Sequence, residues 1–138
     1  MKREKFIVLD VEGMGGVCPY NVGYMVADRY GTIYKERSFA LLENVAVNIY
    51  ECNKAICQIR PKYAEILSDF KNSYFKRKYK TVSNTDFKKK LIKDIQKHKV
   101  KKIYAYNVSF DKRSLQNLFG DDFDTVFKNI EFIDIIPV

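Results

Sequence analysis

Two acidic side chains, Asp10 and Glu12, lie at the end of the first apolar run of the sequence, residues 6–11. The run is short, apolar and partly β-branched, which is typical of a strand buried on both faces. Side chains alternate along a strand, so both carboxylates are expected on one face at its carboxyl end. Like charges so close are unfavourable unless a cation neutralises them, and hard oxygen ligands suit Mg²⁺ or Mn²⁺. The alternative is a strand that ends in two solvated acids, since Asp-x-Glu is a short and common pattern.

A third acid, Asp111, follows a second expected core strand, residues 100–106, and lies in the first turn of the next helix. In an open α/β sheet, ligands bind beyond the carboxyl ends of the strands, where the strand order switches. We expect the strands 6–11 and 100–106 to be neighbours at such a switch, so that Asp111 faces Asp10 and Glu12 across one crevice. The alternative is a first-turn acid with no further role, because acids favour that position.

The remaining pattern supplies the elements that must hold these acids. Two strands joined by a turn at Asp28–Gly31 follow the first strand, and helical periodicity then replaces strand periodicity. Ser83 or Asn84 is expected to cap one helix and Ser109 the last one. This order predicts one domain, 1–138, of the α/β class, in which helices pack on a mixed sheet. The expected elements are strands at 6–11, 21–28, 32–42, 100–106 and 130–136, and helices at about 46–60, 63–70, 84–98 and 110–119.

The amino-acid composition limits the classes of protein to which this chain can belong. The 138 residues are 46% hydrophobic and 14% aromatic, enough for one core. No apolar run approaches the roughly 20 residues of a membrane helix, and no secretory signal is recognisable. The three cysteines, an odd number without metal-site spacing, are expected to be free thiols in a reducing compartment. These features favour the cytoplasm.

Positive charge is concentrated in one segment. The net charge is +8, but residues 71–102 hold 13 Lys and Arg and two acids, which leaves the rest of the chain at −3. Within this segment Tyr74, Phe75 and Tyr79 alternate with lysines and arginines. Lysines neutralise phosphates and aromatic faces stack on unpaired bases, so nucleic acid with single-stranded or frayed 3′ ends is the expected partner. The candidate contacts are Lys76, Arg77 and Tyr79. The alternative is a solvated Lys-rich face with its aromatics, such as Phe87, in the core.

Two motifs resemble those of the DEDD (DnaQ-like) 3′–5′ exonucleases, which have an RNase H-like fold. Residues 6–12, Phe-Ile-Val-Leu-Asp-Val-Glu, look like their first motif, and residues 107–111, Asn-Val-Ser-Phe-Asp, look like their second. The hairpin at 22–31 is similar to phage-encoded members. The resemblance implies hydrolysis of phosphodiester bonds at DNA or RNA ends, with carboxylates holding two divalent ions. It makes Asp10, Glu12 and Asp111 metal ligands and catalytic residues.

Two further residues near the motifs are candidates for substrate contact. Asn107 shapes the second motif. Gly13, with Gly15 and Gly16, does not form a phosphate loop, because no Gly-Lys-Ser/Thr follows. We expect these glycines to let the chain leave the first strand sharply, and a glycine permits close approach of a substrate end to the backbone.

The sequence departs from this family at its third motif. The family's fourth acid lies on a helix after the last core strand, whereas this sequence stops at Val138. Asp134 is the only late candidate for a substitute, and His98 lies too early to be the family's base and is read as a surface residue. Three interpretations stay open: part of a longer exonuclease, a catalytically inactive nucleic-acid-binding module, or a site completed by another chain. An effector that docks its basic face on an acidic protein is a more distant alternative.

Overall fold

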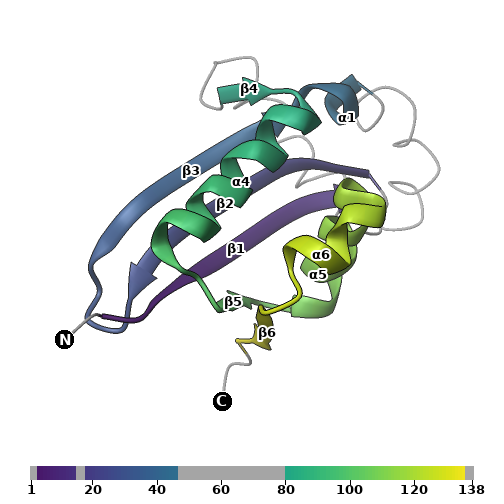
Figure 1. The fold of residues 1–138 in the computed structure, drawn as a ribbon. Coiled ribbons are helices and arrows are strands. Elements are labelled where there is room, and N and C mark those ends of the chain that lie inside the picture. Colours follow the sequence, from purple (N-terminus) through teal and green to yellow (C-terminus); the bar gives the residue numbers. More distant parts are fainter. Residues whose placement is uncertain (1–2, 15–17, 47–79, 136–138) are drawn as a thin grey trace.

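A single mixed sheet organises the molecule. The computed structural model describes residues 3–14, 18–46 and 80–135 (Figure 1). The first three strands form an antiparallel meander, and the last two run parallel to the first. The order across the sheet is β4-β3-β2-β1-β5-β6. The strands are β1 (Lys5–Met14), β2 (Cys18–Asp28), β3 (Ile33–Leu41), β4 (Lys80–Val82), β5 (Lys102–Ala105) and β6 (Glu131–Asp134). The predicted α/β class and the mixed sheet are confirmed.

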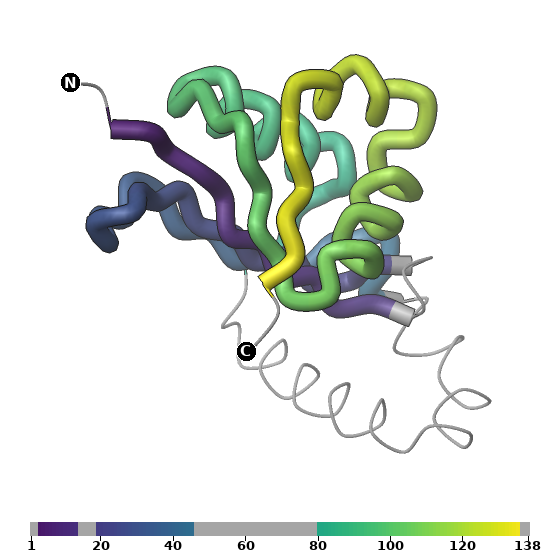
Figure 2. Tube along the Cα trace, turned by 90° about the horizontal axis from the view of Figure 1, so that it is seen from below, coloured from purple at the N-terminus to yellow at the C-terminus, as the bar shows by residue number. Residues whose placement is uncertain are grey.

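Helices cover one face of this sheet. In both views α4, α5 and α6 lie on the same side of the strands (Figures 1 and 2). The helices are α1 (Leu42–Ala46), α4 (Asn84–His98), α5 (Val108–Phe119), the 3₁₀ turn η2 (Gly120–Asp122) and α6 (Phe123–Val126). Helix α5 connects β5 to the parallel strand β6 through η2 and α6, as a helix-linked crossover requires.

Alternation along β1 decides which side chains meet the helices. Ile7, Leu9 and Val11 are buried and belong to the core cluster that also contains Phe87 and Leu91 of α4. The intervening side chains therefore point to the opposite face of the sheet. Asp10 and Glu12 are among them, so the two acids share a face, as the sequence predicts.

Helix α4 is fixed at both ends and along its buried side. The Ser83 hydroxyl accepts a hydrogen bond from the Asp86 N–H at 3.0 Å, which confirms one of the two predicted caps. Lys99 ends the helix in a left-handed conformation, with φ 52°. In the middle of the helix, buried Asp94 accepts hydrogen bonds from the Tyr24 hydroxyl at 2.6 Å and from Arg37 Nε at 2.7 Å. These contacts tie α4 to β2 and β3.

Several predicted boundaries are wrong for local reasons. β1 continues through Gly13 to Met14, and a β-bulge between Glu12 and Gly13 takes up the irregularity, so the chain does not leave the strand there. Helix α5 begins at Val108 with Asn107 as its N-cap residue, and Ser109 lies inside the helix. Strand β4 and helix α6 had no counterpart among the expected elements. The helices expected at 46–60 and 63–70 fall largely or wholly outside the described residues.

Candidate functional site

The two acids of β1 lie where this strand passes the end of its parallel neighbour. β1 pairs with β5 at Ile7–Ile103 and Val8–Tyr104, and β5 ends at Ala105. Past this point β2 still pairs with β1, opposite both Asp10 and Glu12. On the other side, the chain leaving β5 turns into helix α5. The amino-terminal turn of α5 therefore lies beside the last part of β1.

Asp111 makes the contact that joins α5 to β1. Its Oδ1 accepts a hydrogen bond from the backbone N–H of Val11 at 2.9 Å, and the residue is 3% exposed. Val11 stands between Asp10 and Glu12 in the strand, so the carboxylate of Asp111 lies close to both. The expected placement of β1 beside β5, with Asp111 next to the two acids, is thus found. The role of the three residues as metal ligands stays a prediction.

The three carboxylates disfavour one another's charge. Burial, together with the charges of Asp10 and Glu12 and against the lowering effect of the Val11 hydrogen bond, raises the pKa of Asp111 to about 7. Burial and the nearby charge of Asp10 also raise the pKa of Glu12. None of the ion pairs among the described residues includes any of the three. Within the described part of the chain, the site is therefore negative and has no cationic side chain paired with it.

A divalent ion fits the chemistry of this donor set. Carboxylate oxygens are the ligands that Mg²⁺ and Mn²⁺ prefer, and an ion would balance the crowded charge. In the described parts of the chain, however, no group of three or more acidic, histidine or cysteine side chains is arranged to hold an ion. Asp111 is fixed by its hydrogen bond, whereas Asp10 is exposed and Glu12 half-buried.

The start of helix α5 brings other polar groups to this edge of the sheet. Asn107 adopts a left-handed conformation, with φ 56° and ψ 59°, and is exposed. Asp134, at the end of β6, accepts a hydrogen bond from the Val108 N–H at 3.3 Å. The late candidate acid thus contacts the amino terminus of the helix that carries Asp111. Sequence reasoning missed Tyr106, which is 70% exposed at the carboxyl end of β5, although a tyrosine directly before the second motif was a usable signal.

Some of the other residues predicted to contact substrate lie in the described part of the chain, and others lie outside it. Gly13 is buried within β1 and pairs with Pro19 of β2. Its part in substrate binding, like that of Asn107, stays a prediction. Lys76, Arg77 and Tyr79 lie outside the described residues. His98, expected to be a surface residue, is half-buried, and Lys5 and Tyr34 lie against it.

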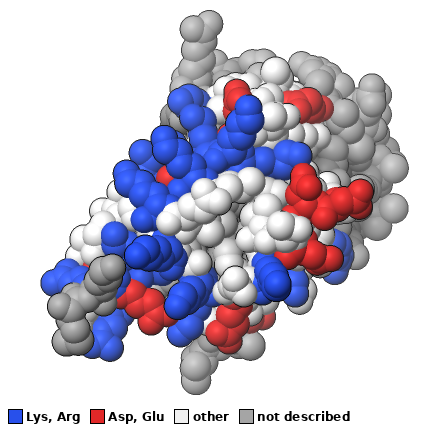
Figure 3. Space-filling view, in the orientation of Figure 1, with Lys and Arg blue, Asp and Glu red and all other residues white. Residues whose placement is uncertain are grey.

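Basic side chains form a separate surface on the helical side. In Figure 3, Lys and Arg gather over α4 and toward the amino end of β1, whereas Asp and Glu gather near α6. The lysines of α4 are Lys88, Lys89, Lys90, Lys93 and Lys97, all exposed or half-buried. We call these five residues the α4 basic face. Phe87, on the same helix, is fully buried, which confirms its predicted place in the core.

Comparisons with known proteins do not assign a function to this chain. No known protein-family model matches the chain, and a search of characterised proteins gave no significant match. None of the helices in the described ranges is long and apolar enough to span a membrane.

Proposed function

We propose that this chain is a metal-dependent 3′–5′ exonuclease-like domain with an RNase H-like fold, acting on phosphodiester bonds at DNA or RNA ends. One observation carries the proposal: Asp111, from the second motif, is hydrogen-bonded to Val11, between the two acids of the first motif. The fold offers further support. A meander of three strands followed by two helix-linked parallel strands is the arrangement that the family resemblance implies, and the acids lie in the second half of β1, beyond the residues that pair with β5.

The acids have distinct tasks in this proposal. Asp111 is a fixed ligand, since the Val11 N–H and the surrounding core hold its carboxylate in place. Asp10 and Glu12 are the adjustable ligands, which close on Mg²⁺ or Mn²⁺ from the open side. A bound divalent ion supplies an activated water and stabilises the leaving oxygen of an in-line displacement at phosphorus. The burial of Asp111 strengthens each of these electrostatic interactions, because the effective dielectric constant is lower there.

Nucleic acid is the substrate class that the rest of the surface favours. The exposed ring of Tyr106 lies at the carboxyl end of β5, beside the second motif, where an unpaired base can stack on it. The α4 basic face provides five lysines, and phosphate neutralisation by lysine releases counterions. Binding should therefore weaken steeply as salt is added.

A second candidate is a catalytically inactive nucleic-acid-binding module of the same fold. One finding favours it: the described acids do not form a ready-made ion site. In this alternative the α4 basic face keeps its role, and the acids of β1 and α5 only maintain the local structure. The two proposals differ in whether nucleic-acid processing requires the acids.

A nuclease assay separates them. Single-stranded DNA and RNA oligonucleotides with a 5′ label are incubated with Mn²⁺ or Mg²⁺ and resolved for stepwise 3′ shortening. The proposal expects shortening by the wild type and its loss in Asp10→Ala and Asp111→Asn. Glu131→Gln is the matched control, because Glu131 is an exposed acid at the start of β6 and far from the carboxyl end of β1. Equal activity in wild type and Asp10→Ala rules out catalysis by this site, and metal-independent binding without cleavage supports the alternative.

A further inference from the structure

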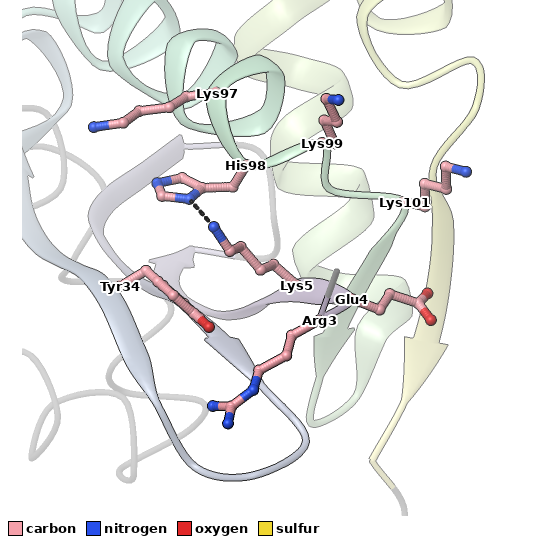
Figure 4. Close-up of a pocket in the computed structure, with 8 residues that line it drawn as sticks. All are labelled: Arg3, Glu4, Lys5, Tyr34, Lys97, His98, Lys99 and Lys101. Atoms are coloured by element: carbon pink, nitrogen blue, oxygen red, sulfur yellow. Dashed lines mark hydrogen bonds between the residues drawn. The ribbon is translucent and has the colours of Figure 1, made fainter. Parts of the chain in front are cut away.

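A cationic cleft lies at the opposite end of β1 from the three acids. It encloses about 800 Å³ between the amino end of β1, the end of α4 and the segment leading to β5 (Figure 4). Two separate segments of the chain, residues 3–5 and 97–101, contribute its five Lys and Arg side chains. These are Arg3, Lys5, Lys97, Lys99 and Lys101. Tyr34 and His98 supply aromatic surfaces, and Glu4 is the one acid that lines it.

Most of this positive charge is unbalanced. Arg3 lies 3.5 Å from Asp28, and the carboxylate of Glu4 is directed to Lys102 at 3.8 Å. Among the described residues, the four lysines of the cleft take part in no ion pair. Cations that line one hollow repel one another unless an anion is shared between them.

The contacts inside the cleft also indicate a positive potential. Lys5 Nζ stands 4.1 Å from the centre of the Tyr34 ring and 3.4 Å from Nδ1 of His98 (Figure 4). An ammonium group can only donate, so a hydrogen bond at this contact requires Nδ1 of His98 to be an unprotonated acceptor. Burial lowers the pKa of His98, and the charges of Lys5 and Lys97 lower it further against the opposing effect of Asp94. The pKa of His98 therefore responds to the positive charges that line the cleft.

The dipole of α4 explains only some of the cations that line the cleft. Cations at the carboxyl end of a helix interact favourably with its dipole, which accounts for Lys97, His98 and Lys99 at the end of α4. It does not account for Lys5, which comes from β1, or for Lys101, which precedes β5. The lining of one hollow by cations of both segments is the feature that calls for an anionic occupant.

We propose that this cleft binds a phosphate group of a nucleotide or of a nucleic-acid strand, at a site separate from the carboxylate site. Multiple ammonium groups suit a phosphate, and the Tyr34 and His98 rings, 6.0 Å apart, offer flat surfaces for the attached base. Lys5 precedes Asp10 by five residues of strand, or about 17 Å. Lys5 also shares the helical side of the sheet with Ile7, whereas Asp10 points to the other side. One phosphate cannot reach both sites, so this inference stands whether or not the acids support catalysis.

The test is binding in EDTA, which removes any contribution from divalent ions at the acids. Inorganic phosphate, AMP and a short oligothymidylate are titrated at low salt while the His98 ring resonances are followed by NMR. The proposal expects these resonances to shift on saturation and the pKa of His98 to rise, since a bound anion favours the imidazolium. Lys97→Gln and Lys101→Gln should each weaken binding by about tenfold, as expected for loss of a charge-assisted hydrogen bond.

A control variant tests whether weaker binding is specific to the cleft. Lys128→Gln removes an exposed lysine that does not line the cleft and should change affinity by less than about twofold. AMP that binds as well as the oligonucleotide identifies a nucleotide site, whereas a far tighter oligonucleotide identifies a strand that continues along the α4 basic face. Both results support the cleft. Unmoved His98 resonances, or equal weakening by Lys128→Gln, overturn it and leave the nuclease proposal untouched.

Discussion

The backbone N–H of Val11 donates a hydrogen bond to Oδ1 of Asp111 at 2.9 Å, although the two residues are 100 positions apart. This contact requires an acceptor oxygen but not a negative charge. Asparagine at position 111 can supply the oxygen and lacks the charge. The structural and the electrostatic contributions of Asp111 can therefore be separated by one substitution.

Asp111→Asn should stabilise the protein in the absence of divalent ions. At pH 8 the wild-type carboxylate is ionised beside Asp10 and Glu12, and burial makes that charge costly. Removing the charge while keeping the hydrogen bond should raise the free energy of unfolding by roughly 1 kcal/mol, after allowance for solvent screening. The measurement is urea unfolding at pH 8 in EDTA. Added Mn²⁺ should then stabilise the wild type but not Asp111→Asn.

Asp111→Ala is the matched control for this substitution. It removes the charge as well, but it leaves the Val11 N–H without its acceptor and opens a small cavity. It should lower the free energy of unfolding by about 1–3 kcal/mol relative to Asp111→Asn. Equal stabilities of the two variants would show that the hydrogen bond to Val11 contributes nothing.

The pH dependence of stability should report the same carboxylate. The pKa of Asp111 is raised from an ordinary value of 3.8 to about 7 in the folded protein. Below pH 4 both states are protonated at this group, and between about pH 4 and 7 the folded state binds more protons than the unfolded state. Its contribution therefore makes metal-free stability fall as pH rises through this window, and it is constant above it. Subtracting the Asp111→Asn curve from the wild-type curve isolates the effect, and a flat difference from pH 4 to 8 would contradict it.

The buried ion pair of α4 should matter far more to stability than any lysine on that helix. Asp94 receives hydrogen bonds from Tyr24 and Arg37, and the side chains of Arg37 and Asp94 are 17% and 4% exposed. Asp94→Ala leaves the Arg37 charge without its partner and should cost about 3–5 kcal/mol. Lys93→Gln, an exposed change on the same helix, should stay within about 0.5 kcal/mol. Urea unfolding of both variants provides the comparison.

Strong local patterns in the sequence were enough to predict the parts of the fold that hold the acids. The helix expected at 84–98 has those limits in the structure, because Ser83 and the spacing of Phe87, Leu91 and Ile95 act within one element. The alternation of β1 placed Asp10 and Glu12 on one face for the same reason. The position of Asp111 facing Asp10 and Glu12 was inferred only indirectly, from the general position of sites in open sheets, and its hydrogen bond to Val11 was not predicted.

Features that depend on distant contacts were not predictable in this way. Strand β4 has three residues and forms only because β3 offers an edge, so it has no period of its own. Ser109 appeared to be the cap of the last helix, but Asn107 tolerates the left-handed conformation that starts the helix earlier. His98 carries no signal of burial in its neighbours along α4, because Lys5 and Tyr34, which lie against it, come from other strands.

The left-handed end of α4 gives a final prediction in which stability and binding change in opposite directions. Lys99 adopts φ 52° and ψ 45°, and its N–H is directed to the carbonyls of Gln96 and Ile95. Glycine adopts this conformation without the steric cost of a Cβ atom, so Lys99→Gly should raise the free energy of unfolding by about 1 kcal/mol. The matched change Lys97→Gly, within the helix, should lower it by a similar amount, because glycine there loses more backbone entropy. Both variants remove one lysine from the cationic cleft, so both should weaken phosphate binding, and urea unfolding paired with phosphate titration measures the two effects. A Lys99→Gly protein less stable than wild type would mean that the lysine side chain itself stabilises the end of α4.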